Sequence, residues 1–265
     1  MSVLTISSLT IKHREETLVQ NIRLSVNEGD WLALVGESGS GKSVTASSIG
    51  GLLPRELIIS SGRIHFGEAN LLDLKEKEWQ NYRGKVISYI FQDYQGAFTP
   101  FMTIGAHFDE MLKTHTNNSK QQRKERALET LKNVNLPEER VYKSYPFQLS
   151  GGQLQRAAIA MAMMLKPKLL IADEPTTALD SITATHVLQL ISNLQQQTNC
   201  AVLFITHDLR HVRKYANKMA VMLKGEIVES GSKTSILQQP QHAYTKALIA
   251  AIPSLRSTKN RLVTI

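Results

Sequence analysis

The sequence predicts an α/β fold, in which short apolar strands alternate with helices. Three observations lead to this prediction. An apolar segment at residues 31–35 enters a glycine-rich loop, and a helical segment at 44–52 leaves it. The same alternation returns after residue 168, whereas residues 104–166 carry apolar side chains at helical spacing. We therefore expect one α/β unit with a mostly helical insertion, and not two successive domains.

The first ninety residues contain short apolar runs that are separated by turn signals. Residues 18–26 and 31–35 flank the polar segment 27–30, which indicates two strands joined by a hairpin-like turn. Further strands are expected at 64–66 and 86–91. The region therefore contributes mostly β structure.

The middle and last parts of the chain show two further patterns. A helix with a solvated basic start is expected from residue 120, because residues 120–126 lack aromatic side chains that could stack on bases. Its apolar positions and the proline that ends it are Leu128, Leu131, Val134, Leu136 and Pro137. The last part alternates again, with strands expected at 168–172, 200–205, 219–223 and 226–229 and a helix at 181–197.

Composition limits the class of protein. The chain has 265 residues, of which 42% are hydrophobic and 20% charged, enough for a globular core. It has no run of about 18 uncharged apolar residues and no basic segment followed by an apolar block at its start, so we expect a cytoplasmic location. Cys200 is the only cysteine, which excludes an intrachain disulfide and a Cys-clustered zinc or iron–sulfur site. Its position before an apolar run indicates a small core residue.

The formal net charge of +8 allows two interpretations. A basic protein can bind nucleic acid. We favour basic faces that lie against nucleotide or an anionic membrane surface, and we expect no nucleic-acid partner.

A phosphate-binding loop is the most informative motif of the chain. The pattern G-x-x-x-x-G-K-[ST], also called Walker A, is matched by Gly36, Glu37, Ser38, Gly39, Ser40, Gly41, Lys42 and Ser43. The glycines let the backbone wrap closely round a polyphosphate, and the loop amides face its oxygens together with the start of the following helix. Lys42 brings a positive charge to the β- and γ-phosphates, and the Ser43 hydroxyl can ligate Mg²⁺. The alternative is a chance match, which the strand–loop–helix context argues against.

Two carboxylates end the apolar strand at 168–172. We expect this strand beside the loop strand, so that Asp173 faces Mg²⁺, through a water molecule. Glu174 would then orient or deprotonate the water that attacks the γ-phosphate. The alternative is an exposed strand end before a turn.

A second glycine-containing motif precedes an expected helix that runs to about residue 165. Ser150 and Gln153 fit a helix capping box, so a purely structural role is available. Gly151 and Gly152 beside the helix start can also form an exposed anion nest. Because this helix lies far along the chain from the phosphate loop, we expect it to serve a nucleotide that another subunit holds.

Six features follow one another along the chain: the phosphate loop, Gln92, the LSGGQ motif at 149–153, the Asp-Glu strand end, Asp180 and His207. In this order they resemble the ATP-binding subunit of an ABC transporter. The resemblance implies a phosphate-loop NTPase core of the ABC-ATPase type, with an antiparallel β subdomain and an inserted α-helical subdomain at about 93–166. It covers residues 1–253, which we interpret as one ATPase domain, followed by a polar basic tail at 254–265. ATP and Mg²⁺ are the implied cofactors.

The resemblance also assigns roles to residues. It implies a head-to-tail dimer, in which each ATP lies between the phosphate loop of one subunit and Ser150, Gly151, Gly152, Gln153 and Asp180 of the other. Gln92 would contact Mg²⁺ and the attacking water, and His207 the γ-phosphate. Val44 would complete the nucleotide site, and His13 stands where the family usually has an aromatic residue that stacks on adenine. Taken alone, Gln92 and His207 would be interpreted as a polar loop residue and a strand-end histidine, but their place in the ordered set of motifs argues against that interpretation.

Within the family, the chain resembles the ATPases of oligopeptide, dipeptide and nickel importers. The most specific match is the segment 240–248, PQHAYTKAL, which is similar to the C-terminal P-x-H-x-Y-T-x-x-L pattern of that group. Tyr94, Phe98 and Thr99 depart from the group's pattern in the loop that docks the membrane subunit. Because the chain has no cysteines after residue 200, it resembles the short nickel or metal-chelate import ATPases more than the peptide import ATPases that carry an iron–sulfur extension.

We therefore predict an ATP-hydrolysing, energy-coupling subunit of a bacterial-type importer for nickel or a metal chelate, with a di- or oligopeptide importer as the alternative. The resemblance implies a second ATPase subunit (a heterodimer, with a homodimer possible), two membrane-spanning permease subunits and an extracytoplasmic substrate-binding protein. The expected location is the cytoplasmic face of the cell membrane, as a peripheral protein. A DNA-repair or translation ATPase, a non-hydrolysing regulatory subunit and an exporter are less consistent with the motifs.

Overall fold

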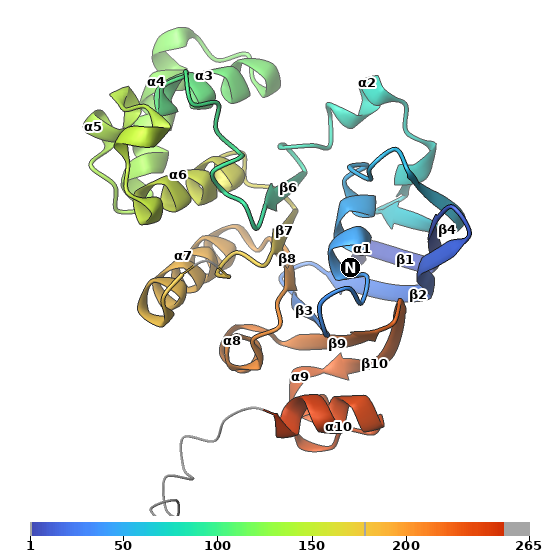
Figure 1. Ribbon diagram of the computed structural model, residues 1–265. Helices are drawn as coiled ribbons and strands as arrows, with labels where there is room; N and C mark the ends of the chain where they lie inside the picture. Colours follow the sequence, from blue (N-terminus) through green and yellow to red (C-terminus); the bar gives the residue numbers. More distant parts are fainter. Residues whose placement is uncertain (1, 178, 252–265) are drawn as a thin grey trace, which may run out of the picture.

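Two sheets and a set of helices make up the structure. The computed structural model describes residues 2–177 and 179–251 (Figure 1). The larger, six-stranded sheet has the order β10 (Glu226–Ser232), β9 (Lys218–Leu223), β3 (Trp31–Val35), β8 (Ala201–Ile205), β7 (Leu169–Asp173) and β6 (Ile87–Ile90). Its strands are parallel except for β10, which runs antiparallel to β9. The smaller, antiparallel sheet has the order β2 (Glu16–Asn27), β1 (Ser2–His13), β4 (Leu57–Phe66) and β5 (Ala69–Asn70).

The expected hairpin across residues 27–30 is wrong in its pairing. The turn exists, because the amide of Asp30 donates to the Asn27 carbonyl at 3.1 Å, but β2 and β3 belong to different sheets. The reason is burial: β3 is buried at every position, as a central parallel strand requires, whereas β2 alternates and covers only one face. Lys218 at the start of β9 binds the Asp30 carboxylate at 2.8 Å and ties this crossing point to the larger sheet.

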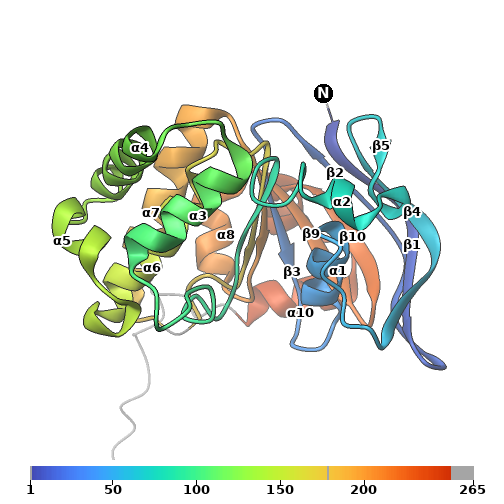
Figure 2. The same ribbon diagram turned by 90° about the horizontal axis from the view of Figure 1, so that it is seen from above.

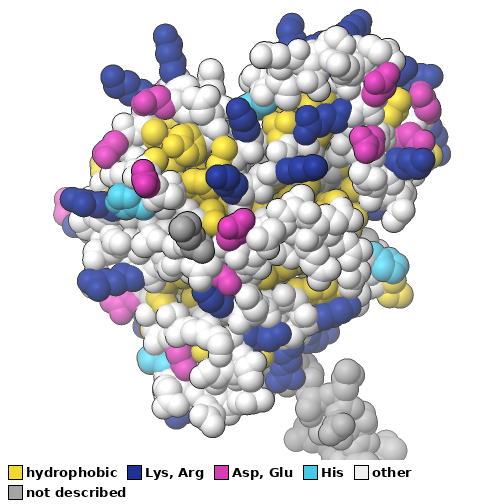
Figure 3. Space-filling model, turned by 180° about the vertical axis from the view of Figure 1, so that it is seen from behind, with side chains coloured by type: hydrophobic (Ala, Val, Ile, Leu, Met, Phe, Trp, Pro, Cys, Tyr) yellow, Lys and Arg dark blue, Asp and Glu magenta, His cyan; other side chains and the backbone are white. Residues whose placement is uncertain are grey.

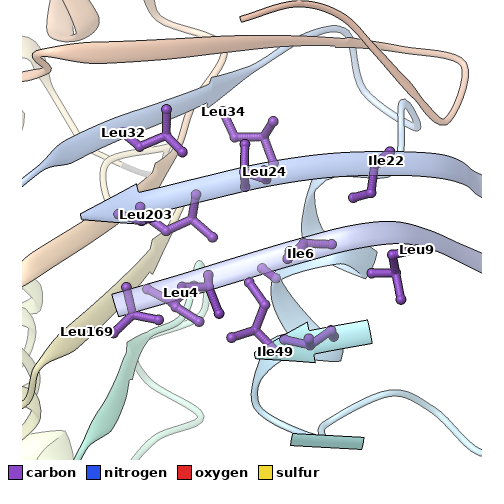
Figure 4. Packing of buried hydrophobic residues seen from close by; sticks show 14 of the residues in the cluster. Leu4, Ile6, Leu9, Ile22, Leu24, Leu32, Leu34, Ile49, Leu169 and Leu203 are labelled. Atoms are coloured by element: carbon purple, nitrogen blue, oxygen red, sulfur yellow. The ribbon is translucent and has the colours of Figure 1, made fainter. Parts of the chain in front are cut away.

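The six-stranded sheet is covered on both faces. Leu32 and Leu34 of β3 point to the antiparallel sheet, where they pack with Leu4, Ile6 and α1 (Figure 4). Trp31 and the alternate positions of β3 face the helices on the other side. Those helices are α6 (Gly151–Met163), α7 (Ser181–Thr198), α8 (Leu209–Tyr215), α9 (Lys233–Gln238) and α10 (Ala243–Ala250). Figure 2 shows the resulting layers, with α1 (Lys42–Ile49) on the side of the antiparallel sheet and α6 and α7 on the opposite side.

The helical insertion has a core of its own. It comprises α3 (Ile104–His115), α4 (Lys120–Asn133), α5 (Glu138–Lys143) and α6, around a buried cluster that includes Phe108, Leu131 and Met164. Ser119 caps α4, so the basic stretch is the start of a helix as predicted. Short elements complete the chain: η1 (Leu71–Asp73), α2 (Glu76–Trp79) and η2 (Pro146–Gln148). The α/β core, the antiparallel sheet and the helical insertion are therefore confirmed.

Three smaller observations bear on the sequence predictions. Cys200 is buried, and burial raises the pKa of its thiol to about 12, so it is a core residue as expected. Within 2–177 and 179–251, none of the helices combines the length and the apolar character that a membrane crossing requires. The predicted tail at 254–265 lies outside the described residues.

Candidate functional site

The phosphate loop joins the end of β3 to the start of α1. Gly41 stands at the N-cap of α1 with φ of 102°, a backbone conformation that side chains with a Cβ rarely adopt. A Cβ on Gly41 would lie 2.9 Å from the Leu18 carbonyl oxygen, and one on Gly36 would lie 2.1 Å from the Met222 carbonyl oxygen. The loop is therefore held tightly between β2 and β9, and only glycine fits at these two positions.

Lys42 lies inside the loop and is 5% exposed. Its ammonium group donates to the carbonyl of Glu37 at 2.6 Å, to the carbonyl of Gly36 at 3.0 Å and to the Ser40 hydroxyl at 3.3 Å. Burial lowers the pKa of Lys42, while the carboxylates of Glu174 and Asp173 act in the opposite direction. The loop thus surrounds a desolvated positive charge with oxygen acceptors from its own backbone and from Ser40.

Asp173 ends β7 and contacts the start of α1. The Ser43 hydroxyl donates to the Asp173 carboxylate at 3.1 Å. Burial raises the pKa of Asp173, because the hydrogen bond from Ser43 and the charge of Lys42 offset the desolvation only in part. The hydroxyl and carboxylate oxygens form a donor set that suits Mg²⁺, which takes few protein ligands and keeps its waters and phosphate ligands.

The expected position of β7 directly beside the loop strand is wrong. β8 lies between β3 and β7, and it pairs in parallel with both. Ser43 still reaches Asp173 because α1 crosses the ends of these strands on one face of the sheet. The intervening strand also explains why His207, which follows β8, lies next to the end of β7.

Glu174 is held by contacts from three directions. Its amide donates to the Ile205 carbonyl at 3.0 Å, and the Thr177 hydroxyl donates to its carboxylate at 2.7 Å. His207 Nδ1 lies 3.5 Å from the other carboxylate oxygen. Glu174 also has φ of 45°, an uncommon value for a residue with a Cβ, and such strain is concentrated at functional sites.

The LSGGQ segment lies in another part of the molecule. Ser150 and Gln153 form the predicted capping box: the Ser150 hydroxyl accepts from the Gln153 amide at 3.3 Å, and the Gln153 side chain accepts from the Ser150 amide at 3.2 Å. A Cβ on Gly152 would meet no atom within 4 Å, so the segment borders open space. Both ribbon views place α6 on the opposite side of the six-stranded sheet from α1. One chain does not bring this segment to its own phosphate loop.

The remaining predicted residues lie at element ends. Asp180 caps α7 and is exposed, and a hydrogen bond from the Thr183 hydroxyl lowers its pKa. Gln92 is exposed in the loop after β6, the strand that pairs with β7. Val44, in the first turn of α1, is half-buried against the core, and His13 is half-buried at the end of β1, paired with Glu16 and Leu57. Stacking of His13 on adenine stays a prediction.

Sequence reasoning missed a contact to the phosphate loop. The hydroxyl of Tyr244, in α10, accepts a hydrogen bond from the amide of Glu37 at 2.8 Å. Tyr244 lies in the segment 240–248, which was recognised as a family pattern, but the pattern alone does not show that this tyrosine reaches residue 37. The two residues are 207 positions apart, so only the folded chain reveals the contact.

Charged side chains elsewhere do not form one stripe on the face seen in Figure 3. Lys and Arg side chains are spread in separate groups over that face, with Asp and Glu side chains among them. This distribution differs from the continuous basic track that a nucleic-acid backbone follows.

Two family models match the chain. The model for "ABC transporter" matches residues 19–177, and the model for "Oligopeptide/dipeptide transporter, C-terminal region" matches residues 228–265. Among curated proteins, the metal-staphylopine import system ATP-binding protein CntD of Staphylococcus aureus is 42% identical over 253 residues, which is 94% of this chain and 93% of that protein. The dipeptide transport ATP-binding protein DppD of Lactococcus lactis is 45% identical over 249 residues, covering 93% of this chain and 71% of that protein.

Solved structures show the same fold. A dimeric post-hydrolysis state of the ATP-binding cassette MJ0796, bound to ADP and phosphate, superposes with a TM-score of 0.75 at 31% identity, covering 86% of this chain and 98% of that chain. A second dimeric structure of this cassette, described as a bacterial ABC transporter cassette, gives a TM-score of 0.76 with the same coverage.

Proposed function

This chain belongs to the ABC transporter family as an ATP-binding, ATP-hydrolysing importer subunit, and from that premise we propose that it powers the import of nickel or a metal chelate. In this proposal, ATP binding closes a dimer and hydrolysis reopens it. One observation supports the ATPase activity most directly: the phosphate loop and the C-terminal ends of β7 and β8 lie close together. There Ser43 contacts Asp173 at 3.1 Å, and His207 lies 3.5 Å from Glu174.

ATP and Mg²⁺ fit the groups at this meeting point. The phosphate loop, residues 36–43, would bind ATP, with the amides at the start of α1 and the Lys42 ammonium group facing the phosphates, and Val44 and His13 would complete the nucleotide site. Ser43, Gln92 and Asp173, the last through a water molecule, would hold Mg²⁺, which neutralises charge on the β- and γ-phosphates. The raised pKa of Asp173 supports this, since a cation would supply the compensation that the carboxylate lacks.

Glu174 and His207 are the proposed catalytic residues. The Thr177 hydroxyl holds one oxygen of the Glu174 carboxylate, and the other, which lies 3.5 Å from His207 Nδ1, would accept a hydrogen bond or a proton from the attacking water. The side chain of His207 is 62% exposed, so its ring can turn toward a γ-phosphate while it stays within reach of Glu174. Glu174 follows β7 and His207 follows the neighbouring strand β8, so the two side chains would act together without a large rearrangement of the chain.

A second ATPase subunit would complete each site. Ser150, Gly151, Gly152 and Gln153, at the exposed start of α6, would bind the γ-phosphate of an ATP held by the partner, and Asp180 would cross the interface. The open space at Gly152 and the position of α6 away from α1 support this arrangement in trans. We propose a heterodimer, with a homodimer as the alternative.

The membrane-facing region would lie where the insertion meets the core. An apolar cavity of about 320 Å³ lies there, lined by Leu52, Phe91, Tyr94, Ala97, Met111 and Met161. Phe91 and Phe101, on the loop after β6, are 46% and 87% exposed. We propose that two permease subunits dock on this region at the cytoplasmic face of the membrane. The loop that carries Gln92 and the insertion would transmit closure to them, and an extracytoplasmic binding protein would deliver the cargo.

The cargo has two candidates. Similarity to a metal-staphylopine import ATPase supports a metal chelate. Similarity to a dipeptide transport ATPase, together with the C-terminal family match, supports a di- or oligopeptide. We propose the metal or metal chelate first, because the relative whose name gives a metal cargo is covered almost end to end by this chain.

Uptake by cells separates the two candidates. In cells whose own copy is replaced by Lys42→Ala, the accumulation of labelled nickel is compared with that of a labelled dipeptide. Loss of nickel accumulation with intact dipeptide uptake supports the metal importer. Loss of dipeptide uptake alone moves the chain to the peptide branch and leaves the ATPase assignment in place.

A further inference from the structure

A residue near the C-terminal end of the described chain contacts the phosphate loop directly. The Tyr244 hydroxyl, on α10, accepts from the Glu37 amide at 2.8 Å. We propose that Tyr244 is a positioning residue of the phosphate loop, through which the C-terminal segment sets the affinity for ATP. The proposal rests on the proposed function of the loop as an ATP site.

The segment before Tyr244 is built to hold this side chain in place. The Glu229 carboxylate on β10 accepts from the amides of Gln241 at 2.9 Å and His242 at 3.1 Å. His242 caps α10 by accepting from the Tyr244 amide at 3.2 Å. Tyr244 itself is half-buried and packs against the core cluster between the larger sheet and its helices. Each of these contacts limits the positions that the phenol ring can adopt.

Glu37 is thereby held on both sides of its backbone. Tyr244 binds its amide, and Lys42 binds its carbonyl at 2.6 Å. Together the two bonds hold the first part of the loop, between the end of β3 and Gly39. Ordering a flexible loop costs conformational free energy at the moment of binding, so a loop that is ordered beforehand binds its ligand more tightly.

The position of the contact argues for support rather than competition with ATP. Glu37 lies at the outer end of the loop, five residues before Lys42, whereas the amides at the start of α1 are those that a helix N-terminus offers to phosphate. The phenol therefore occupies a part of the loop backbone other than the helix start. If the hydroxyl instead blocked phosphate, removing it would strengthen ATP binding.

The experiment removes only the hydroxyl. In the full-length Tyr244→Phe protein, hydrogen exchange of the loop amides is measured without nucleotide, and the Kd for MgATP, the KM and the kcat are measured with it. We expect faster exchange at residue 37 and an MgATP Kd and KM raised by about fivefold, the effect of one net hydrogen bond, with kcat changed less than about twofold. Binding that weakens before the chemistry changes is the sign of a positioning role.

Tyr215→Phe is the matched control. The Tyr215 hydroxyl donates to the Thr185 carbonyl at 3.2 Å, so this variant also loses one hydroxyl-to-backbone bond, but away from the loop. It is expected to keep wild-type exchange at residue 37 and a wild-type Kd. A Tyr244→Phe protein with unchanged exchange and an unchanged Kd, or with tighter MgATP binding, would overturn the proposal. A wild-type protein that binds no MgATP would overturn the proposed function instead, while the exchange measurement still tests the contact.

Discussion

The phosphate loop and the LSGGQ segment differ in how much of their surroundings the chain itself supplies. Around the loop, backbone and side chains from several distant segments meet: Met222, Asp173 and Tyr244 all approach it. At Gly152, by contrast, an added Cβ would meet nothing within 4 Å. The chain itself encloses the phosphate loop, which we call the enclosed half of the ATP site, whereas the start of α6 is open to another subunit and is the open half.

Glu174→Gln is expected to have the largest effect. An amide cannot accept a proton from water, so kcat should fall by about 10²–10⁴-fold, the usual contribution of a general base. Binding of MgATP should stay near the wild-type value, and ATP-bound dimers should accumulate in size-exclusion chromatography. Wild-type turnover in this variant would remove Glu174 from its proposed role.

Lys42→Ala tests ATP binding by the phosphate loop, the enclosed half of the ATP site. It removes a charged donor that contacts three oxygen atoms inside the loop. Because one hydrogen bond from a charged donor to a phosphate oxygen contributes roughly 1.5–3 kcal/mol, we expect the loss of this donor to raise the Kd for MgATP by about 100-fold. Isothermal titration gives the Kd directly, and tight binding that persists would contradict the assignment of the loop.

Gly152→Val and Gly41→Val form a pair that separates the two regions. The side chain at 152 enters open space, so the melting temperature and the MgATP Kd of the monomer should stay unchanged while hydrolysis falls by roughly 100-fold, because the partner's phosphate loses its contacts. The side chain at 41 collides with the Leu18 carbonyl and forces a strained φ, so this variant should lose stability as well as binding.

Stability and hydrolysis are measured separately for each of these two variants. Calorimetry reports the melting temperature, and phosphate release reports hydrolysis. Full hydrolysis by Gly152→Val would show that the start of α6 does not approach a nucleotide. The start of α6 would then not be the open half of an ATP site.

Asp173→Asn is expected to have the smallest effect, on stability without nucleotide. Burial raises the pKa of Asp173 above its unfolded value, so the ionised carboxylate destabilises the folded chain at neutral pH. The variant should therefore melt on the order of 1–3 °C higher near pH 7, since about 1 kcal/mol corresponds to roughly 2–4 °C in domains of this size.

The pH dependence of this gain has a definite sign. As the pH falls through the raised pKa of Asp173, the wild-type carboxyl gains its proton first in the folded state, and the difference between the two proteins should shrink. Thermal melts of both proteins from pH 7 down to about pH 4 measure it. A difference that grows toward acid would mean that the pKa of Asp173 is lowered in the fold.

The sequence predicted most of the fold because its signals are local. Apolar runs gave the strands at 169–173 and 201–205, and the loop pattern gave a strand, a turn and a helix in that order. The hairpin at 27–30 was wrong, because a turn signal does not show whether its two strands pair with each other. That depends on burial of β3 on both faces, which in turn depends on strands that come more than 150 residues later.

The site shows the same division. The sequence by itself determined the residue types: glycines where a Cβ would collide, a lysine near the end of the glycine-rich loop, two carboxylates at a strand end, and a serine with a glutamine that cap α6. Only the tertiary structure decided that β8 lies between β3 and β7, that His207 therefore lies beside Glu174, and that Tyr244 reaches Glu37. Residue chemistry and local turns are set by neighbours in the chain, whereas strand order and long-range contacts are set by which apolar faces can be buried together.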